Sequence, residues 1–331
     1  MMSTPQSRIK MTIVPLRSAE DNLLADNESV SLGFGMSVER CKKLLGDSNL
    51  WIWHHKASPF DKEEMDDWDI CLVHRYQWHP VTGEPDEASA KLVAYVLAHL
   101  RLINPHRDSV DDYIQLEETT TGGYNAFRCN KAAFRPNRFL SDCENLCWGI
   151  NRTHLDELKS FMPWIVNFAS NWELCYPLWI SLFFIEQGYL SGQNFRTIHL
   201  FRVMALEGLF CSETSFGKKA LTGRIPKLLG AGIDLYEAYS VDYFPLPQLE
   251  LTVDLIKDIY TLRNKIAHSD VFPDAWRKRV VRHGLMNEAI TYGDQLLEAA
   301  TSICRLAWLK IIKDGLQSTF SDKVKMQAYL R

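Results

Sequence analysis

Hydrophobic and polar residues alternate differently in the two halves of the chain. In the first 150 residues, short apolar runs such as "LWIWHH" and "DICLVHRYQW" stand between turn formers, a pattern that predicts β-strands. "EASAKLVAYVLAHLRLINP" (87–105) has helical periodicity and ends at Pro105, and "DDYIQLEETTTGGYNAFRC" (111–129) predicts two strands joined by a Thr/Gly turn. We therefore expect an α+β domain over residues 1–150.

Helical periodicity dominates from residue 151 onward. Helices are expected from Thr153 to Ala169, kinked or broken at Pro163, then over 177–189, and from a cap at Ser191 onward. The basic segment 217–230 predicts a short helix, and 287–312 predicts a long packing helix. Several helices with short connections are typical of a bundle, so the fold expected for residues 151–331 is an all-α helical bundle.

One of these helices has a continuous apolar face. The apolar residues of 251–266 recur at steps of three and four positions, so on a helix they form a single stripe. The stripe consists of Leu251, Leu255, Ile259, Leu262 and Ile266. It predicts an amphipathic helix that ends in the polar sequence "RNKIAHSD" (263–270).

Composition narrows the class of protein. The chain has 331 residues, of which 46% are hydrophobic and 24% charged, as is typical of a folded globular protein of about two domains. Its formal net charge of -4 gives no general attraction to nucleic acid, so such binding requires a local basic cluster. The first residues lack the features of a secretory signal, and the most apolar run, Leu174–Ile185, is shorter than the roughly 20 residues of a membrane span. We expect a cytoplasmic protein with reduced cysteines that does not enter a membrane.

The end of the amphipathic helix carries a candidate catalytic motif. Arg263 and His268 fit the pattern R-x-x-x-x-H, and Asn264 follows the arginine directly. The same spacing joins Arg101 and His106, so spacing alone is not specific. On an ideal helix Asn264 and His268 share a face, and Arg263 lies about 100° from Asn264, within reach of a long side chain. Basic residues at a helix C-terminus can also act only by opposing the helix macrodipole, and the spacing leaves this alternative open.

The motif and its surroundings resemble the HEPN superfamily, and within it the Apea-like HEPN domains. "LRNKIAHSD" (262–270), "FRVMALEGLF" (201–210), the basic "KKALTGRIPKLLG" (218–230) and a long final helix occur in the order that such domains show. The resemblance covers about residues 152–315. It implies a helical bundle that forms a homodimer and brings two R-x-x-x-x-H motifs together as a metal-independent endoribonuclease. Arg263, Asn264 and His268 fall on the family motif, and the Arg101 pair does not.

These residue types suit RNA cleavage by attack of the 2′-hydroxyl group. A histidine exchanges protons near neutral pH, so His268 would serve as general base or acid, and the second His268 of a dimer, or water, would take the other role. The planar fork of Arg263 would hold the phosphate, and Asn264 would orient His268 or contact the ribose. Since DNA lacks the 2′-hydroxyl group, the mechanism predicts cleavage of RNA and not of DNA.

Charged residues near the motif are further candidates. Glu207 interrupts an apolar helix face, and we expect it to pair with Arg263 or with Arg202. Basic clusters before and after the motif helix are expected to bind RNA, although clusters of this kind are often only a solvated surface. The RNA-binding candidates are Lys218, Lys219, Arg224, Arg277, Lys278 and Arg279.

No metal or cofactor site is expected. The acidic and histidine-containing segment 54–69 lacks a metal-binding pattern, the cysteines lack a second ligand pair, and Gly33–Gly35 lacks the nucleotide-binding motifs. Residues 1–150 are expected to sense a trigger or restrain the nuclease, with a regulatory protein as a further partner; use in a toxin system or in antiviral defence is implied by the family alone. The alternative is a catalytically inactive HEPN-type module that binds RNA or a protein partner. A separate enzyme activity of residues 1–150 also stays open.

Overall fold

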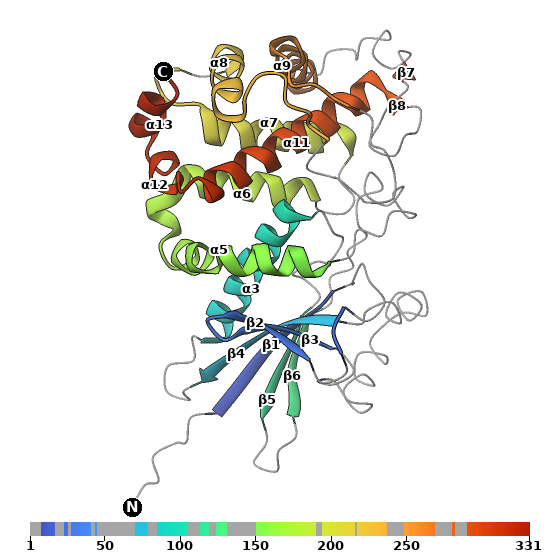
Figure 1. Ribbon diagram of the computed structural model, residues 1–331, viewed down its shortest axis with the longest axis vertical. Helices are drawn as coiled ribbons and strands as arrows, with labels where there is room; N and C mark the ends of the chain where they lie inside the picture. The colour runs from blue at the N-terminus through green and yellow to red at the C-terminus, as the bar shows by residue number, and fades with distance from the viewer. Residues whose placement is uncertain are drawn as a thin grey trace, which may run out of the picture. The chain divides into compact units, whose positions relative to one another are not determined.

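The computed structural model describes residues 8–16, 23–25, 28–40, 44, 70–78, 85–104, 113–118, 124–130, 150–189, 194–215, 217–236, 248–268, 280–281 and 290–331. The chain divides into two compact units (Figure 1). The first comprises Met1–Phe134 and Glu144–Ser170, and the second comprises Arg135–Cys143 and Asn171–Arg331. The division falls after Ser170, whereas the change in sequence pattern falls after residue 150, because the helix at 152–170 packs with the first unit.

The N-terminal unit is built on an antiparallel sheet of six strands in the order β2-β3-β4-β1-β5-β6. The strands are β1 (Arg8–Leu16), β2 (Ser29–Gly33), β3 (Met36–Arg40), β4 (Ile70–Trp78), β5 (Tyr113–Glu118) and β6 (Tyr124–Asn130). Helix α3 (Pro85–Ile103) packs on β4 and β1, α5 (Arg152–Ser170) packs on β2, and the two helices pack on each other. The α+β pattern expected for this part of the chain is present. The strand expected at "LWIWHH" lies outside the described residues.

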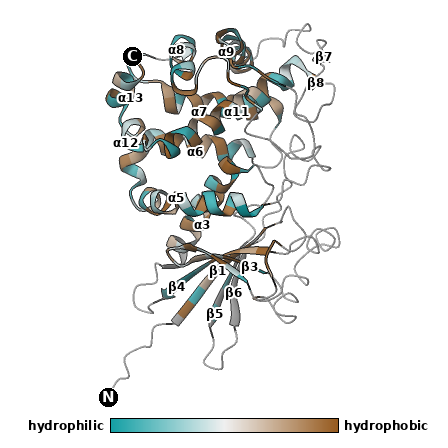
Figure 2. Ribbon diagram, viewed as in Figure 1, coloured by the Kyte–Doolittle hydropathy of each residue, from teal (hydrophilic) through white to brown (hydrophobic). Residues whose placement is uncertain are grey.

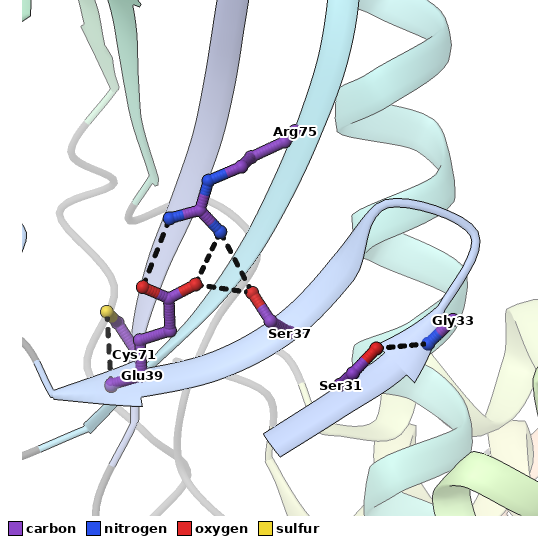
Figure 3. Close-up of polar contacts among 6 residues, drawn as sticks. All are labelled: Ser31, Gly33, Ser37, Glu39, Cys71 and Arg75. Carbon is purple, nitrogen blue, oxygen red and sulfur yellow. Dashed lines mark hydrogen bonds and ion pairs between the residues drawn. The ribbon is translucent and has the colours of Figure 1, made fainter. Parts of the chain in front are cut away.

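Two details of this unit differ from the sequence pattern or add to it. The sequence leaves a kink or a break open at Pro163, and α5 is a single helix through this residue, so there is no break. Lys159 and Pro163 are both exposed, and water can replace the lost backbone bond on that side. On the sheet, Arg75 of β4 reaches Glu39 of β3 with both Nη groups, at 3.0 Å for the Nη2–Oε2 pair (Figure 3). Ser37 donates to the same carboxylate at 2.6 Å. The charges of Arg75 and Glu39 pair with each other, and this ion pair joins strands β3 and β4.

The C-terminal unit is mainly helical. Its elements are η1 (Trp172–Cys175), α6 (Tyr176–Tyr189), α7 (Phe195–Phe210), α8 (Gly217–Leu229), α9 (Val253–Ala267), β7 (Val280–Val281), β8 (Ile290–Thr291), α11 (Tyr292–Lys313), α12 (Gln317–Phe320) and α13 (Lys323–Tyr329). Helix α7 packs on α6, α8, α9 and α11, and α11 also packs on α8 and α9. Hydrophobic residues predominate along α6, α7 and α11 (Figure 2). Because α7 and α11 each pack on several other helices, these two lie at the centre of the core. None of the described helices combines the length and apolar composition that crossing a membrane requires.

Two helix starts differ from the expectation. Helix α7 begins after Asn194 and not at Ser191, because the Asn194 side chain accepts a hydrogen bond from the backbone N–H of Thr197 at 3.0 Å. Helix α11 begins at Tyr292, five residues later than expected, because Thr291 and Asp294 form a capping box and the preceding residues pair as strand β8 with β7. The short helices α12 and α13 were not anticipated from the sequence.

Helix α9 carries the motif and is held on two sides. Thr252 caps its first turn by accepting from the backbone N–H of Leu255 at 3.1 Å. Its buried residues are Leu255, Ile256, Ile259 and Leu262, which include the central part of the expected stripe. The ring of His199 on α7 hydrogen-bonds to the carbonyl oxygen of Ile259 at 2.9 Å, and the Tyr292 hydroxyl of α11 donates to Asp258 at 2.6 Å. These contacts fix the helix against α7 and α11.

Candidate active site

The motif residues lie at the C-terminal end of α9, a helix that packs beside α7 and α8 (Figure 1). Arg263 and Asn264 are half-buried, whereas His268 is exposed and forms the C-cap of the helix. The backbone N–H of His268 donates to the carbonyl oxygen of Asn264 at 3.0 Å, which keeps the histidine one helical turn from Asn264. The helix therefore brings the three expected residues to one end of the unit.

The guanidinium group of Arg263 is held by its own chain. Nη1 donates to Oδ1 of Asn264 at 3.2 Å, and Nη2 pairs with Oε2 of Glu207 on α7 at 3.4 Å. The Nε group is buried and has no hydrogen-bond partner among the described residues. The side chains of Arg263 and Glu207 remain 26% and 23% exposed, so the pair faces solvent along one edge. The 3.4 Å separation is longer than a usual charge-assisted hydrogen bond, so the pair can open without a large loss.

The sequence offered two partners for Glu207, and the structure contains the pair with Arg263. Arg202 is buried elsewhere in α7, where its Nε donates to the Thr301 hydroxyl at 3.1 Å. Its Cζ lies 4.3 Å from the centre of the Tyr189 ring. Arg202 thus joins α7 to α11 and α6, and its role is structural.

The side chain of Asn264 contacts Arg263, although one of its two expected roles is to orient His268. Its side-chain oxygen accepts from Arg263, and within the part of the chain that the structure describes no hydrogen bond joins it to the His268 side chain. The structure therefore links Asn264 to the position of the guanidinium group rather than to that of the imidazole. The arginine side chain is long enough to turn back to the amide of the next residue, although adjacent positions on a helix do not face each other.

Tyr260 is a member of the site that the sequence analysis missed. Its ring centre lies 5.6 Å from the Cζ atom of Arg263. Burial raises the pKa of the Tyr260 hydroxyl, and the negative charge of Glu207 and a hydrogen bond with it raise the pKa further, so the hydroxyl stays protonated. The spacing contains a signal: Tyr260 precedes Arg263 by three positions and Asn264 by four, which places all three on adjoining parts of the helix surface.

The first residue of α8 lies close to the Tyr260 side chain. A side chain at Gly217, the first residue of α8, would place its Cβ 3.0 Å from the Tyr260 hydroxyl. Gly217 also has a φ of +69°, in the region that favours glycine. Glycine at this position therefore leaves room for the Tyr260 hydroxyl beside Glu207.

The basic candidates separate into three groups. Lys218 and Lys219 are exposed in the first turn of α8, and the Lys218 ammonium donates to the Thr261 hydroxyl of α9 at 3.2 Å. Arg224 donates to the carbonyl oxygen of Phe210 and so caps α7, a structural use of its charge. Arg277, Lys278 and Arg279 lie outside the described residues.

Metal ligands do not gather in the described part of the chain. No group of three or more His, Cys, Asp or Glu residues there is arranged to hold a metal ion. The acidic segment 54–69 and the pair Cys143 and Cys147 lie outside the described residues.

The buried histidine behind α9 leads to a prediction about stability and pH. Burial lowers the pKa of His199 from its ordinary value of 6.5 to about 4, and the hydrogen bond to the Ile259 carbonyl offsets only part of this shift. The unfolded chain takes up a proton as the pH falls below 6.5, but the folded chain does so only near pH 4. We expect the free energy of unfolding to fall by roughly 3 kcal/mol from this group as the pH drops through that window.

The measurement is urea unfolding of the chain and of His199→Gln between pH 4 and 7. Glutamine keeps an N–H donor for Ile259 but does not titrate, so the variant is expected to show a shallower dependence on pH. The half-buried His74 and the buried His99 of the N-terminal unit also have pKa values lowered to about 4, and their effect is common to both chains. The same slope in both chains would show that His199 does not contribute.

Comparison with known proteins gives no assignment. No family model matches the chain, and neither the curated proteins nor the solved structures compared with it provide a match. The function is therefore argued from the residues of the site and their geometry.

Proposed function

We propose that the C-terminal unit is a metal-independent endoribonuclease of the HEPN type that acts as a homodimer. The observation that carries the proposal is the arrangement at the end of α9. Glu207 and Asn264 hold a partly exposed guanidinium group on Arg263, and an exposed histidine ends the same helix five positions later. The resemblance of residues 152–315 to Apea-like HEPN domains supports the same assignment.

The reaction would begin with attack of the 2′-hydroxyl group on the adjacent phosphate. His268 would accept the proton of that hydroxyl group or donate one to the departing 5′-oxygen. Arg263 would stabilise the negative charge of the pentacoordinate phosphorus through its planar fork. One chain supplies one His268, so an isologous dimer with both motifs near its two-fold axis would supply the second.

The surrounding residues would prepare Arg263 before the substrate arrives. Glu207 and Asn264 bind its two Nη groups, and Tyr260 supports it from the ring side while contacting Glu207. A group that is held in advance requires little reorganisation during the reaction. The N-terminal unit would then sense a trigger or restrain the site, alone or with a regulatory protein.

The same contacts also favour a second candidate function. Both Nη groups of Arg263 are occupied by its own chain, as expected of a module that binds RNA or a protein partner without cleaving it. The two candidate functions differ in whether the chain cleaves RNA.

The experiment that separates them offers the purified chain an RNA oligonucleotide and the DNA of the same sequence, both in EDTA. The nuclease proposal predicts cleavage of the RNA, with 2′,3′-cyclic phosphate and 5′-hydroxyl ends, and no cleavage of the DNA. RNA binding without cleavage would favour the binding module. Equal cleavage of RNA and DNA, or RNA cleavage that occurs only when Mg²⁺ replaces the EDTA, would contradict the proposed mechanism.

A further inference from the structure

The solvent-facing side of α9 carries a row of polar residues that leads to the candidate site. At about 100° per residue, Lys257, Thr261, Asn264, Lys265 and His268 lie within roughly 100° of one another on the helix. The buried residues occupy the opposite side. Lys257 and His268 are exposed, and Thr261, Asn264 and Lys265 are half-exposed. The row therefore ends at the candidate catalytic histidine.

A lysine of α8 joins the row halfway along. The Lys218 ammonium donates to the Thr261 hydroxyl at 3.2 Å, and Thr261 in turn donates to the carbonyl oxygen of Lys257 at 2.7 Å. Lys257, Lys218 at the level of Thr261, and Lys265 thus recur every four helical positions, or about 6 Å along the axis. Regularly spaced cations of this kind suit a polyanion with repeating phosphates.

Two carboxylates near the row do not cancel it. Asp254 pairs with Lys257 at 2.8 Å, but this pair is exposed, and exposed ion pairs contribute little, so a phosphate can displace the aspartate. Asp258 lies on the flank of the helix and accepts the Tyr292 hydroxyl at 2.6 Å. Two other cations of α8 point elsewhere: Arg224 binds the Phe210 carbonyl, and Lys227 binds the carbonyl oxygens of Leu330 and Arg331.

We propose that Lys257, Lys218 and Lys265 form a track for the backbone of single-stranded RNA that leads along α9 to His268. The proposal rests on the proposed function, and it adds the path and the strandedness of the substrate to it. A single row of cations contacts one backbone, so an unpaired strand fits it better than a duplex. Of these three lysines, only Lys218 belongs to a basic cluster in the sequence. Lys257 and Lys265 are eight positions apart and join the row only on the folded helix.

The test measures RNA binding by the full chain with His268→Ala, which prevents cleavage during the experiment. The probe is a fluorescently labelled single-stranded RNA oligonucleotide, followed by anisotropy over a series of salt concentrations. Lys257→Gln and Lys265→Gln are each expected to weaken binding several-fold and to reduce the slope of log affinity against log salt by about 0.7–1. Lys218→Gln is expected to act in the same way.

The matched control is Lys310→Gln. Lys310 on α11 pairs with Asp314 at 2.8 Å and is 40% exposed, close to the 46% of Lys257, but it lies off the row. It is expected to leave both the affinity and the slope unchanged. Thermal unfolding of all variants checks that folding is preserved.

The outcomes distinguish this inference from the proposed function. If the lysine variants keep the full salt slope while the unmutated chain cleaves RNA, the track is wrong and the nuclease assignment stands. Tighter binding of duplex RNA through the same lysines would overturn the assignment to single strands. If the chain neither binds nor cleaves RNA at low salt, both proposals fail.

Discussion

Replacing His268 with alanine is expected to lower the rate of RNA cleavage by about 10²- to 10⁴-fold, the usual contribution of a general acid or base. The side chain is exposed at the end of α9, and the cap hydrogen bond to Asn264 comes from the backbone, so folding does not depend on the imidazole. Cleavage rates are measured in EDTA, and thermal unfolding of each variant is measured alongside.

The matched control for this substitution is His106→Ala. His106 has the same spacing from Arg101 as His268 has from Arg263, but it lies outside the region that resembles HEPN domains. It is expected to cleave at the unmutated rate. If His268→Ala also retained that rate, His268 would have no part in the reaction.

Replacing Arg263 with lysine is expected to lower cleavage by about 10²- to 10³-fold although the positive charge is kept. The two Nη groups bind Glu207 and Asn264 at the same time, and an ammonium group offers no such planar fork. The loss is expected mainly in kcat, because negative charge on the phosphate oxygens grows toward the transition state. Steady-state kinetics on one RNA substrate separate kcat from KM.

Arg196→Lys serves as the control for the chemical change. Arg196 is exposed in the first turn of α7, eleven positions before Glu207, and takes no part in the hydrogen bonds of Arg263. Its variant is expected to match the unmutated chain in both constants. An Arg263→Lys variant with unchanged kcat would mean that the guanidinium fork does not act on the phosphate.

Features set by spacing on one helix were predictable from the sequence. The steps of three and four positions predict that Leu255, Ile259 and Leu262 are buried, and they are. The same spacing predicts that Asn264 and His268 lie one turn apart at the end of the helix, as they do in α9. Ile266, the last member of the stripe, is only half-buried. Short-range periodicity therefore predicts the face of a helix well but not how far its contact with neighbours extends.

Features that depend on packing between distant segments were harder to predict. Glu207 and Arg263 are 56 positions apart, and only the packing of α7 on α9 decides between Arg263 and Arg202 as the partner. Arg224 belongs to a basic cluster in the sequence, yet its guanidinium group donates to the carbonyl oxygen of Phe210 at the end of α7. Tyr260 resembles a core residue until Glu207 and Arg263 are placed around it.

Two helix starts also differ from the positions expected from the sequence. Helices α7 and α11 begin after Asn194 and Thr291, because the side chains of these residues accept from backbone N–H groups of the first helical turn. Caps compete over a few positions, so sequence patterns give helix boundaries only within a few residues.

The most direct test of a shared dimer site is RNA cleavage by mixed dimers. Unmutated and His268→Ala subunits are exchanged in known proportions, and the rate is measured at equal total protein in EDTA. If both histidines of a dimer act on one phosphodiester, an equal mixture retains about a quarter of the unmutated rate, since only that fraction of dimers has both. A rate of about one half, proportional to the unmutated chains, would show that each chain acts alone and would contradict the composite site.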